Sequence, residues 1–398
     1  MKRTTCALAL ALSAVVVVGC SDEGRIIQPP ELNNDQVVTT PLQDRYIVVL
    51  NDDVRDVRGV ASRMALAGEG TLDQIYTTAL KGFAVEMTRE QALEMSLDSR
   101  VAYVEQDMMI TLVAAQQAAA PGGKPGKPDK PGNGDDGDSC SSGSQSTPWG
   151  IARVNGGSGN ASGRAFVLDT GIDLDHCDLN VSTADGFNAF TRGRDGRSLD
   201  DGHGHGSHVA GTIGAMDNDF GVIGVAPGAI VVPVKVLGSN GSGSNSGVIA
   251  GVDHVALVAG SGDVANMSLG GGISTALDNA VIAAANSAVF ALAAGNSSQD
   301  ASFSSPARAG GESSDDDIYT ISAIDSNDDF ASFSNFGDDV EFAEPGVSIP
   351  STYKNGGYAT MSGTSMAAPH AAGILLLGSI TDGGSVNGPG GSYTIGVH

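Results

Sequence analysis

The stretch VLDTGID, Val167–Asp173, ends an apolar run in an aspartate and then turns. Two runs rich in glycine and small residues follow it along the chain, GHGSHVAGT at Gly204–Thr212 and SGTSMAAPH at Ser362–His370. Together they supply an Asp, a His and a Ser in that order, each beside glycine and an apolar segment. A nucleophile, a general base and a carboxylate that orients the base are the groups that acyl transfer needs.

The order Asp, His, Ser is that of subtilisin, and it differs from the orders in chymotrypsin and the α/β-hydrolases. Because three independent motifs coincide, the chain from Pro148 to Gly373 resembles the subtilases, most of all their proteinase K-like branch. The resemblance implies a serine endopeptidase that hydrolyses peptide bonds of proteins. It assigns Ser365 as the nucleophile, His205 as the general base and Asp169 as the residue that orients His205.

The same resemblance implies the rest of the site. Asn296, which ends ALAAGN, matches the side chain that binds the oxyanion. Two glycine-rich edges match those that hold an extended peptide substrate by β-addition, although composition alone would make both of them turns. The small apolar walls suit a medium or large uncharged side chain before the scissile bond. The substrate-binding residues implied are Gly241, Ser242, Gly243, Ser268, Leu269, Gly270, Ala293, Ala294 and Gly295.

These residues also have plainer interpretations and rival functions. Asp169 and Ser365 are common types at helix caps, and Asn296 fits a turn after glycine. A second hypothesis is a metallohydrolase, and a third is an inactive subtilase-like binding protein. The metal ligands of the second hypothesis would be Asp200, Asp201, His203, His205 and His208. Glycines on both sides of His205 favour a backbone approached by substrate over a zinc site.

Apolar strands alternate with helices of small residues after Pro148. Strands that are apolar throughout indicate a mainly parallel sheet covered on both faces, so we expect a doubly wound α/β domain. Motif residues then fall at the carboxyl ends of strands or at helix starts. The expected strands are Ala165–Asp169, Ile230–Leu237, Val264–Leu269, Ala288–Gly295 and Ile318–Ile324, and the expected helices are Val209–Met216, Gly247–Val258, Ser274–Ser287 and Thr364–Leu377.

A small α+β domain is expected upstream, at residues 41–113. Its pattern predicts strands at Tyr46–Leu50, Phe83–Met87 and Val101–Asp107, with helices at Val54–Ala67 and Thr88–Leu97. The runs YIVVL, KGFAVEM and VAYVEQD resemble the propeptide of subtilases. The resemblance implies that this domain is an intramolecular inhibitor of a precursor that processes itself.

The other segments carry signals for export and cleavage. Residues 1–20 are expected to be a signal peptide, with a charged start and an apolar run too short to span a bilayer. The VVGC sequence before residue 21 resembles a lipoprotein box, which predicts lipidation of Cys20 and a transient membrane anchor; ordinary signal cleavage is the alternative. Residues 21–40 are expected to be a tether, residues 114–147 a cleavable Pro/Gly/Lys-rich linker, and residues 148–398 the catalytic domain.

Charge and cysteine content limit the partners. The formal net charge is −25, and residues 141–398 hold 8 Lys and Arg against 26 Asp and Glu. Such a surface repels nucleic acid and anionic membranes. The subtilase resemblance implies protein or peptide substrates, and with the signal segment we expect a secreted monomer. Export implies an oxidising compartment, in which Cys140 and Cys177 would form a disulfide; two free thiols are the alternative.

Two further expectations concern metal and the C-terminus. No cofactor is expected for catalysis, but the proteinase K-like branch has a structural calcium site near this position. The matching ligands are the backbone of Asp316 and Ile318 and the carboxylate of Glu341, next to an acidic insertion. The residues after Leu377 are expected to form a glycine-rich tail, which leaves the packing of the last helix open.

Overall fold

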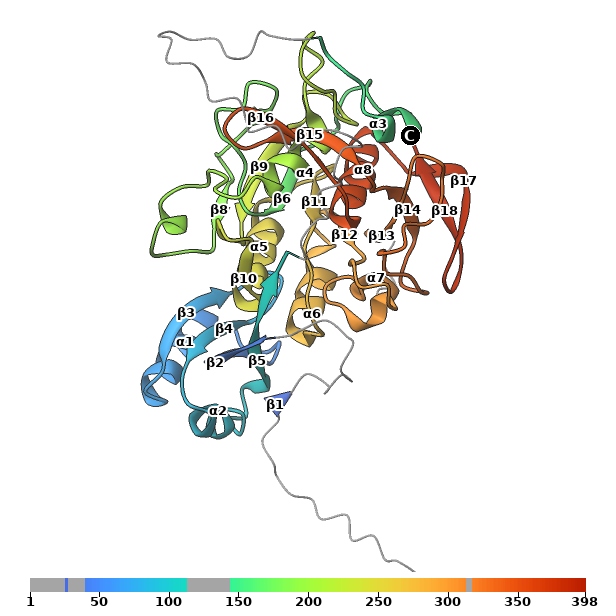
Figure 1. Ribbon diagram of the computed structural model, residues 1–398. Helices are drawn as coiled ribbons and strands as arrows, with labels where there is room; N and C mark the ends of the chain where they lie inside the picture. The colour runs from blue at the N-terminus through green and yellow to red at the C-terminus, as the bar shows by residue number, and fades with distance from the viewer. Residues whose placement is uncertain (1–25, 28–39, 113–143, 313–316) are drawn as a thin grey trace, which may run out of the picture.

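The computed structural model describes residues 26–27, 40–112, 144–312 and 317–398, and a small N-terminal domain lies against one end of a larger domain (Figure 1). The predicted signal peptide, most of the predicted linker, Cys20, Cys140 and Asp316 lie outside these residues. In the described part of the chain, no helix is both long enough and apolar enough to cross a membrane.

The larger domain is built on a ten-stranded sheet, in which only the last hairpin is antiparallel. The strand order is β17-β18-β14-β13-β12-β11-β6-β9-β7, and β8 also pairs with β9. A doubly wound, mainly parallel sheet is therefore confirmed. The strands are β6 (Ala165–Asp169), β7 (Asn180–Val181), β8 (Phe187–Asn188), β9 (Ile230–Lys235), β11 (Val264–Met267), β12 (Val289–Ala293), β13 (Ile318–Ile324), β14 (Phe342–Pro345), β17 (Thr381–Gly388) and β18 (Gly391–Val397).

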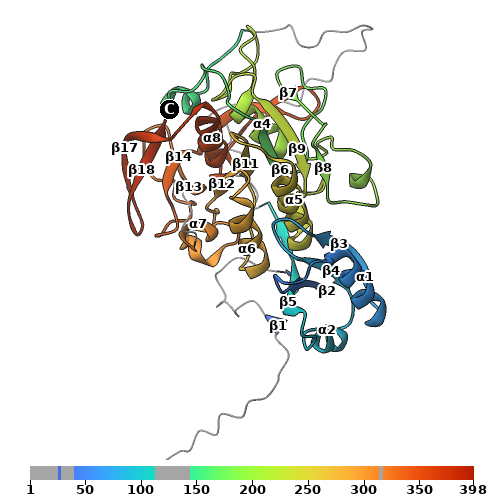
Figure 2. The same ribbon diagram turned by 180° about the vertical axis from the view of Figure 1, so that it is seen from behind.

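Helices cover both faces of this sheet (Figure 2). One face packs on α4 (His205–Gly214) and α8 (Thr364–Leu377) and the other on α5 (Asn245–Val258) and α6 (Thr275–Ala284), each through a buried apolar cluster. Burial of these clusters stabilises the fold by about 25 cal/mol per Å² of apolar surface. The shorter elements are α3 (Trp149–Arg153), α7 (Ala309–Glu312), the 3₁₀ turns Asp195–Arg197 and Ala301–Phe303, and the hairpin β15 (Ile349–Tyr353) and β16 (Gly357–Met361).

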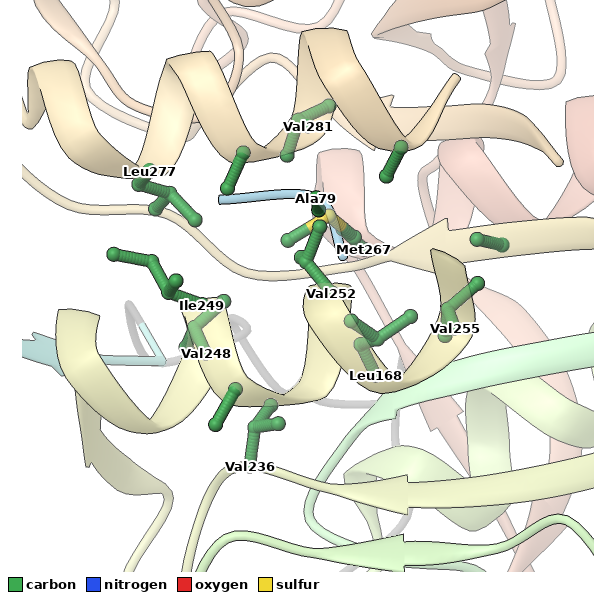
Figure 3. Close-up of a cluster of buried hydrophobic side chains, with 14 of the residues drawn as sticks. Ala79, Leu168, Val236, Val248, Ile249, Val252, Val255, Met267, Leu277 and Val281 are labelled. Carbon is green, nitrogen blue, oxygen red and sulfur yellow. The ribbon is translucent and has the colours of Figure 1, made fainter. Parts of the chain in front are cut away.

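The N-terminal domain is an antiparallel sheet with two helices on one face. Its elements are β2 (Thr40–Leu50), α1 (Val57–Ala67), β3 (Thr71–Tyr76), β4 (Gly82–Glu86), α2 (Arg89–Met95) and β5 (Val101–Thr111), and β1 (Ile26–Ile27) adds a short parallel strand. Thr88 and Gln91 form the capping box that the Thr-x-x-Gln pattern predicts. The opposite face of the sheet packs on α5 and α6, where Ala79 joins Val252 and Val281 in one cluster (Figure 3).

Two segments differ from the sequence-based expectation. The glycine-rich residues after Leu377 form the β17–β18 hairpin, and β18 pairs in parallel with β14. Alternate residues Tyr393, Ile395 and Val397 are buried, and this period-two burial outweighs the glycines. The expected tether contributes β1, which pairs with β5, so it is not wholly without structure.

Candidate active site

Asp169 and His205 lie in contact at the end of a buried strand. Asp169 is the last residue of β6 and His205 is the first residue of α4. His205 Nδ1 is 2.9 Å from Asp169 Oδ1 and 2.8 Å from Oδ2, and the two side chains are 2% and 0% exposed. The contact holds the ring with Nδ1 toward the carboxylate, which leaves Nε2 as the nitrogen that can accept a proton.

The electrostatic surroundings favour a positive charge on His205. Burial lowers the pKa of this ring, but the charge and hydrogen bond of Asp169, together with the charge of Asp201, outweigh burial and the pKa is raised. Asp201 is itself buried and accepts five hydrogen bonds from the loop and helix around His205; the donors are Thr170 Oγ1, the amides of His203, Gly204 and Ser207, and Ser207 Oγ. The His205 ring is therefore surrounded by fixed, negatively charged groups.

Ser365 is the second residue of α8 and is 8% exposed. Its hydroxyl donates to the Ser268 carbonyl at 3.1 Å, and among the described residues it makes no hydrogen bond with His205. Pro369, four residues later, has no N–H, so the Ser365 carbonyl accepts from Ser268 Oγ at 2.7 Å instead. Because α4 and α8 pack against each other, His205 and Ser365 occupy the first turns of neighbouring helices. Rotation of the Ser365 hydroxyl, or binding of a substrate, can bring this hydroxyl within hydrogen-bond distance of His205 Nε2.

The side chain of Asn296 lies at the start of α8, next to Ser365. Its Oδ1 accepts from the Thr364 amide at 2.8 Å and from Thr364 Oγ1 at 3.0 Å. Two donors on one oxygen fix which way the amide points, so Nδ2 remains as a donor. The Ser365 amide is among the first N–H groups of α8, which have no intrahelical acceptor. Together the two groups can hold a developing negative charge.

The predicted pocket walls lie together beside Ser365. They line one pocket, and Leu112 of the N-terminal domain is one of its lining residues; the others include Ser268, Leu269, Gly270, Ala293, Ala294, Gly295, Asn296 and Ser365. The other predicted edge is not part of this lining. Ser242 and Gly243 belong to the short strand β10 (Ser242–Ser244), so this run is extended rather than a turn, while Gly241 precedes the strand with φ +74°.

The alternative metal site gains no support from these contacts. His208 Nε2 bonds the Ile349 carbonyl at 2.9 Å, and burial lowers the pKa of His208 to about 3. Asp201 is committed to hydrogen bonds. Over residues 40–112, 144–312 and 317–398, no group of three His, Cys, Asp or Glu is placed to hold a metal ion.

The calcium prediction rests on one described carboxylate. Glu341 accepts a hydrogen bond from the Thr320 amide, and burial raises the pKa of Glu341 to about 7. Ile318 lies in β13, and the third expected ligand, Asp316, is outside the described residues. Calcium binding here therefore stays a prediction.

The N-terminal domain occupies the glycine-rich edge of the cleft. Its last strand, β5, pairs in antiparallel fashion with β10, with Gly243 opposite Ile110. The pairing extends past the strand, because the Leu112 amide donates to the Gly241 carbonyl at 2.9 Å. In Figure 1 β5 runs from the small domain toward β10, like an added strand on an open edge. Sequence patterns did not indicate this pairing, because it joins segments about 130 residues apart.

Buried carboxylates fasten the two domains at helix ends. Glu105 in β5 accepts from Ser274 Oγ and from the Ala276 amide, at the start of α6. Asp107 accepts from the Ser246 amide and Oγ, at the start of α5. Burial raises the pKa of both carboxylates and outweighs the N–H groups at these helix starts, which lower it. A carboxylate of α5 binds back to the small domain; it belongs to Asp253 and accepts from the amides of Thr77, Thr78 and Ala79.

Comparison with known families identifies both domains. Residues 166–378 match the family described as "Subtilase family", and residues 45–113 match "Peptidase inhibitor I9". The first match covers more than half of the chain. The chain belongs to the subtilase family. It is therefore a serine peptidase, made with a propeptide of the inhibitor I9 type.

Curated relatives agree with this assignment. An "Extracellular serine proteinase" of Thermus sp. (strain Rt41A) is 39% identical over 77% of this subtilase and 68% of the relative. "Subtilisin-like serine protease Pen c 1" of Penicillium citrinum is 34% identical over 92% of this chain and 87% of its own. A solved structure, "a cold adapted subtilisin-like serine proteinase", is 41% identical, covers 57% of this chain and 82% of that one, and superposes with a TM-score of 0.49.

Proposed function

We propose that this subtilase is an exported endopeptidase in which Ser365 attacks the peptide carbonyl and His205 takes its proton and returns it to the leaving amine. Asp169 orients His205, while Asn296 Nδ2 and the Ser365 amide bind the oxyanion. The observation that carries the proposal is the buried contact of His205 Nδ1 with both oxygens of Asp169. A carboxylate in that position stabilises the imidazolium that forms during the reaction.

Covalent labelling tests this assignment. A serine-directed fluorophosphonate is expected to label the matured enzyme once, and peptide mapping should place the label on Ser365, because only an activated serine attacks the phosphorus centre. A metallohydrolase or an inactive binding protein would stay unlabelled. Label on another serine would contradict the assignment even if the protein is active.

We further propose that residues 41–113 inhibit the enzyme within the precursor until a cut in residues 114–147 separates the domains. The pairing of β5 with β10 and the position of Leu112 in the pocket support inhibition by occupation of the substrate edge. The apolar cluster shared with α5 and α6 supports a chaperone-like role in folding.

Affinity between propeptide and enzyme is expected to fall as pH rises. Burial raises the pKa of Glu105 to about 7 in the complex, and the pKa of Asp107 is raised by burial too. A free, exposed glutamate has a pKa of about 4.3, so the complex holds a proton that the separated parts release. The affinity is therefore greatest below pH 4.3 and decreases as the pH rises through 7. Deprotonation of Glu105 is expected to weaken binding of the propeptide on the order of 10- to 100-fold.

The inhibition constant of added propeptide, measured against the mature enzyme from pH 5 to 9, checks this prediction. Glu105→Gln keeps a neutral partner for α6 and should flatten the profile. Glu90→Gln is the matched control on the exposed start of α2 and should leave the profile unchanged. An inhibition constant that improves with rising pH would refute the link.

Export and tethering complete the proposal. We propose that residues 1–20 direct secretion, that Cys20 carries lipid, and that Cys140 pairs with Cys177 after export. The extracellular relative from Thermus supports secretion. Because Cys20 lies on the propeptide side of any cut in residues 114–147, processing would release a soluble catalytic domain and leave the anchor behind.

A further inference from the structure

His203 is held in place beside the proposed site without a part in the proposed mechanism. Its amide donates to Asp201 Oδ1 at 2.8 Å, and its carbonyl accepts from the Tyr353 hydroxyl at 3.0 Å. The backbone is therefore fixed from both sides, and the ring has a defined position, with its centroid 6.4 Å from that of His205.

The ring of His203 faces the edge that the propeptide strand occupies. A Cβ built on Gly241 would lie 3.2 Å from His203 Nε2 and 3.4 Å from Leu112 Cδ1. The His203 ring and the Leu112 side chain therefore both lie next to Gly241, whose carbonyl accepts a hydrogen bond from the Leu112 amide. A substrate residue that binds in the place of Leu112 would put its own side chain beside His203 Nε2.

No described residue accepts a hydrogen bond from His203 Nε2, so the ring can offer a donor to that side chain. Burial and then the neighbouring His205 lower the pKa of His203, against the smaller effects of Asp201 and Asp169, so the ring is neutral at neutral pH. Nδ1 is buried and has no hydrogen-bond partner in the described part of the chain. A proton on Nδ1 would lack an acceptor, which is costly, so the proton belongs on Nε2.

A lysine, Lys354, lies close to His203. Lys354 Nζ donates to the Gly202 carbonyl, next to His203, at 2.7 Å, and its charge also lowers the pKa of His203. The carboxylates of Asp201 and Asp169 act on the same ring in the opposite sense. The Lys354 ammonium is a positive charge that would attract a negative side chain bound beside His203.

We propose that His203, supported by Lys354, is a specificity residue that selects substrates with a hydrogen-bond-accepting side chain, Glu or Gln, at the position of Leu112. This inference rests on the proposed function and names its substrate class. One additional hydrogen bond in a half-buried site is expected to raise kcat/KM about three- to tenfold over a leucine of similar size. The side chain of Leu112 has no acceptor and cannot bond to His203 Nε2.

Profiling cleavage sites in a library of proteome-derived peptides tests the proposal. The mature wild-type enzyme should show enrichment of Glu and Gln at one position close to the scissile bond. His203→Phe keeps a ring but removes the donor, and should erase this enrichment; His203→Asn keeps a donor and should retain part of it. Lys354→Met should weaken the preference for Glu more than that for Gln.

Ratios of kcat/KM for peptides that differ only at the enriched position remove any common effect of the substitutions on turnover. An enrichment that survives unchanged in His203→Phe, or a wild-type profile without any preference for acceptors, would overturn the inference while the peptidase assignment stands. Failure of the mature wild-type enzyme to cleave any peptide would instead refute the proposed function.

Discussion

Replacement of Ser365 by alanine is expected to abolish peptidase activity and to leave the precursor uncleaved at close to full length. The variant lacks the nucleophile, so turnover should fall by about 10⁶-fold. Self-processing needs the same nucleophile, so the propeptide should stay attached. Activity against a protein substrate and the intact mass of the purified chain measure both effects.

A serine three residues earlier provides the matched control. Ser362 is buried, and its hydroxyl accepts a hydrogen bond from the Ser348 amide at 2.8 Å, away from the pocket lining. Ser362→Ala should mature and cleave substrate, with some loss of stability. Normal processing of Ser365→Ala in a host that lacks other proteases would contradict the assignment of the nucleophile.

The sequence predicts the central layers of the catalytic domain well, because their signal is local. The strands Ala165–Asp169 and Ile318–Ile324 and the helix Thr364–Leu377 have the predicted bounds. Each is a continuous apolar or small-residue run between turn residues, and a strand buried on both faces needs no other pattern. The helix of His205 begins four residues earlier than its apolar residues indicate, because Gly204 and Gly206 have a low helix propensity and give no signal for a helix start.

Elements at the margins of both domains were missed for the opposite reason. The strand Thr71–Tyr76 is partly exposed and alternates weakly, and the hairpin after Leu377 is rich in glycine. Neither has a strong local signal, and both form because a neighbouring strand offers an edge with free N–H and C=O groups. Pairing of this kind depends on tertiary structure that a local window does not contain.

The candidate site shows the same limit. Motifs single out Asp169, His205 and Ser365 one by one, and the structure adds the Asp169–His205 contact and the orientation of Asn296. The roles of these residues stay predictions until they are tested. No motif indicates that Leu112 lines the pocket, because that contact joins residues of two domains that are far apart in the sequence.

Asp169→Asn is expected to lower kcat by about 10⁴-fold with little change in KM. An asparagine oxygen can still accept from His205 Nδ1, but the amide NH₂ can also donate to it, so the ring can take the tautomer in which Nε2 carries the proton and cannot act as a base. The negative charge that stabilises the imidazolium is lost as well. Steady-state kinetics of the variant, with the rate of its self-processing as a second readout, give the two values.

The pH profile separates this role from a loss of folding. Asp169 raises the pKa of His205, so its neutral replacement should move the acid limb of kcat/KM to lower pH, because a lower pKa keeps the ring unprotonated further into acid. Asp200→Asn changes a neighbouring exposed carboxylate and should keep both the rate and the limb close to wild type. A variant that loses activity with the acid limb unmoved would mean that Asp169 supports the fold and does not act on His205.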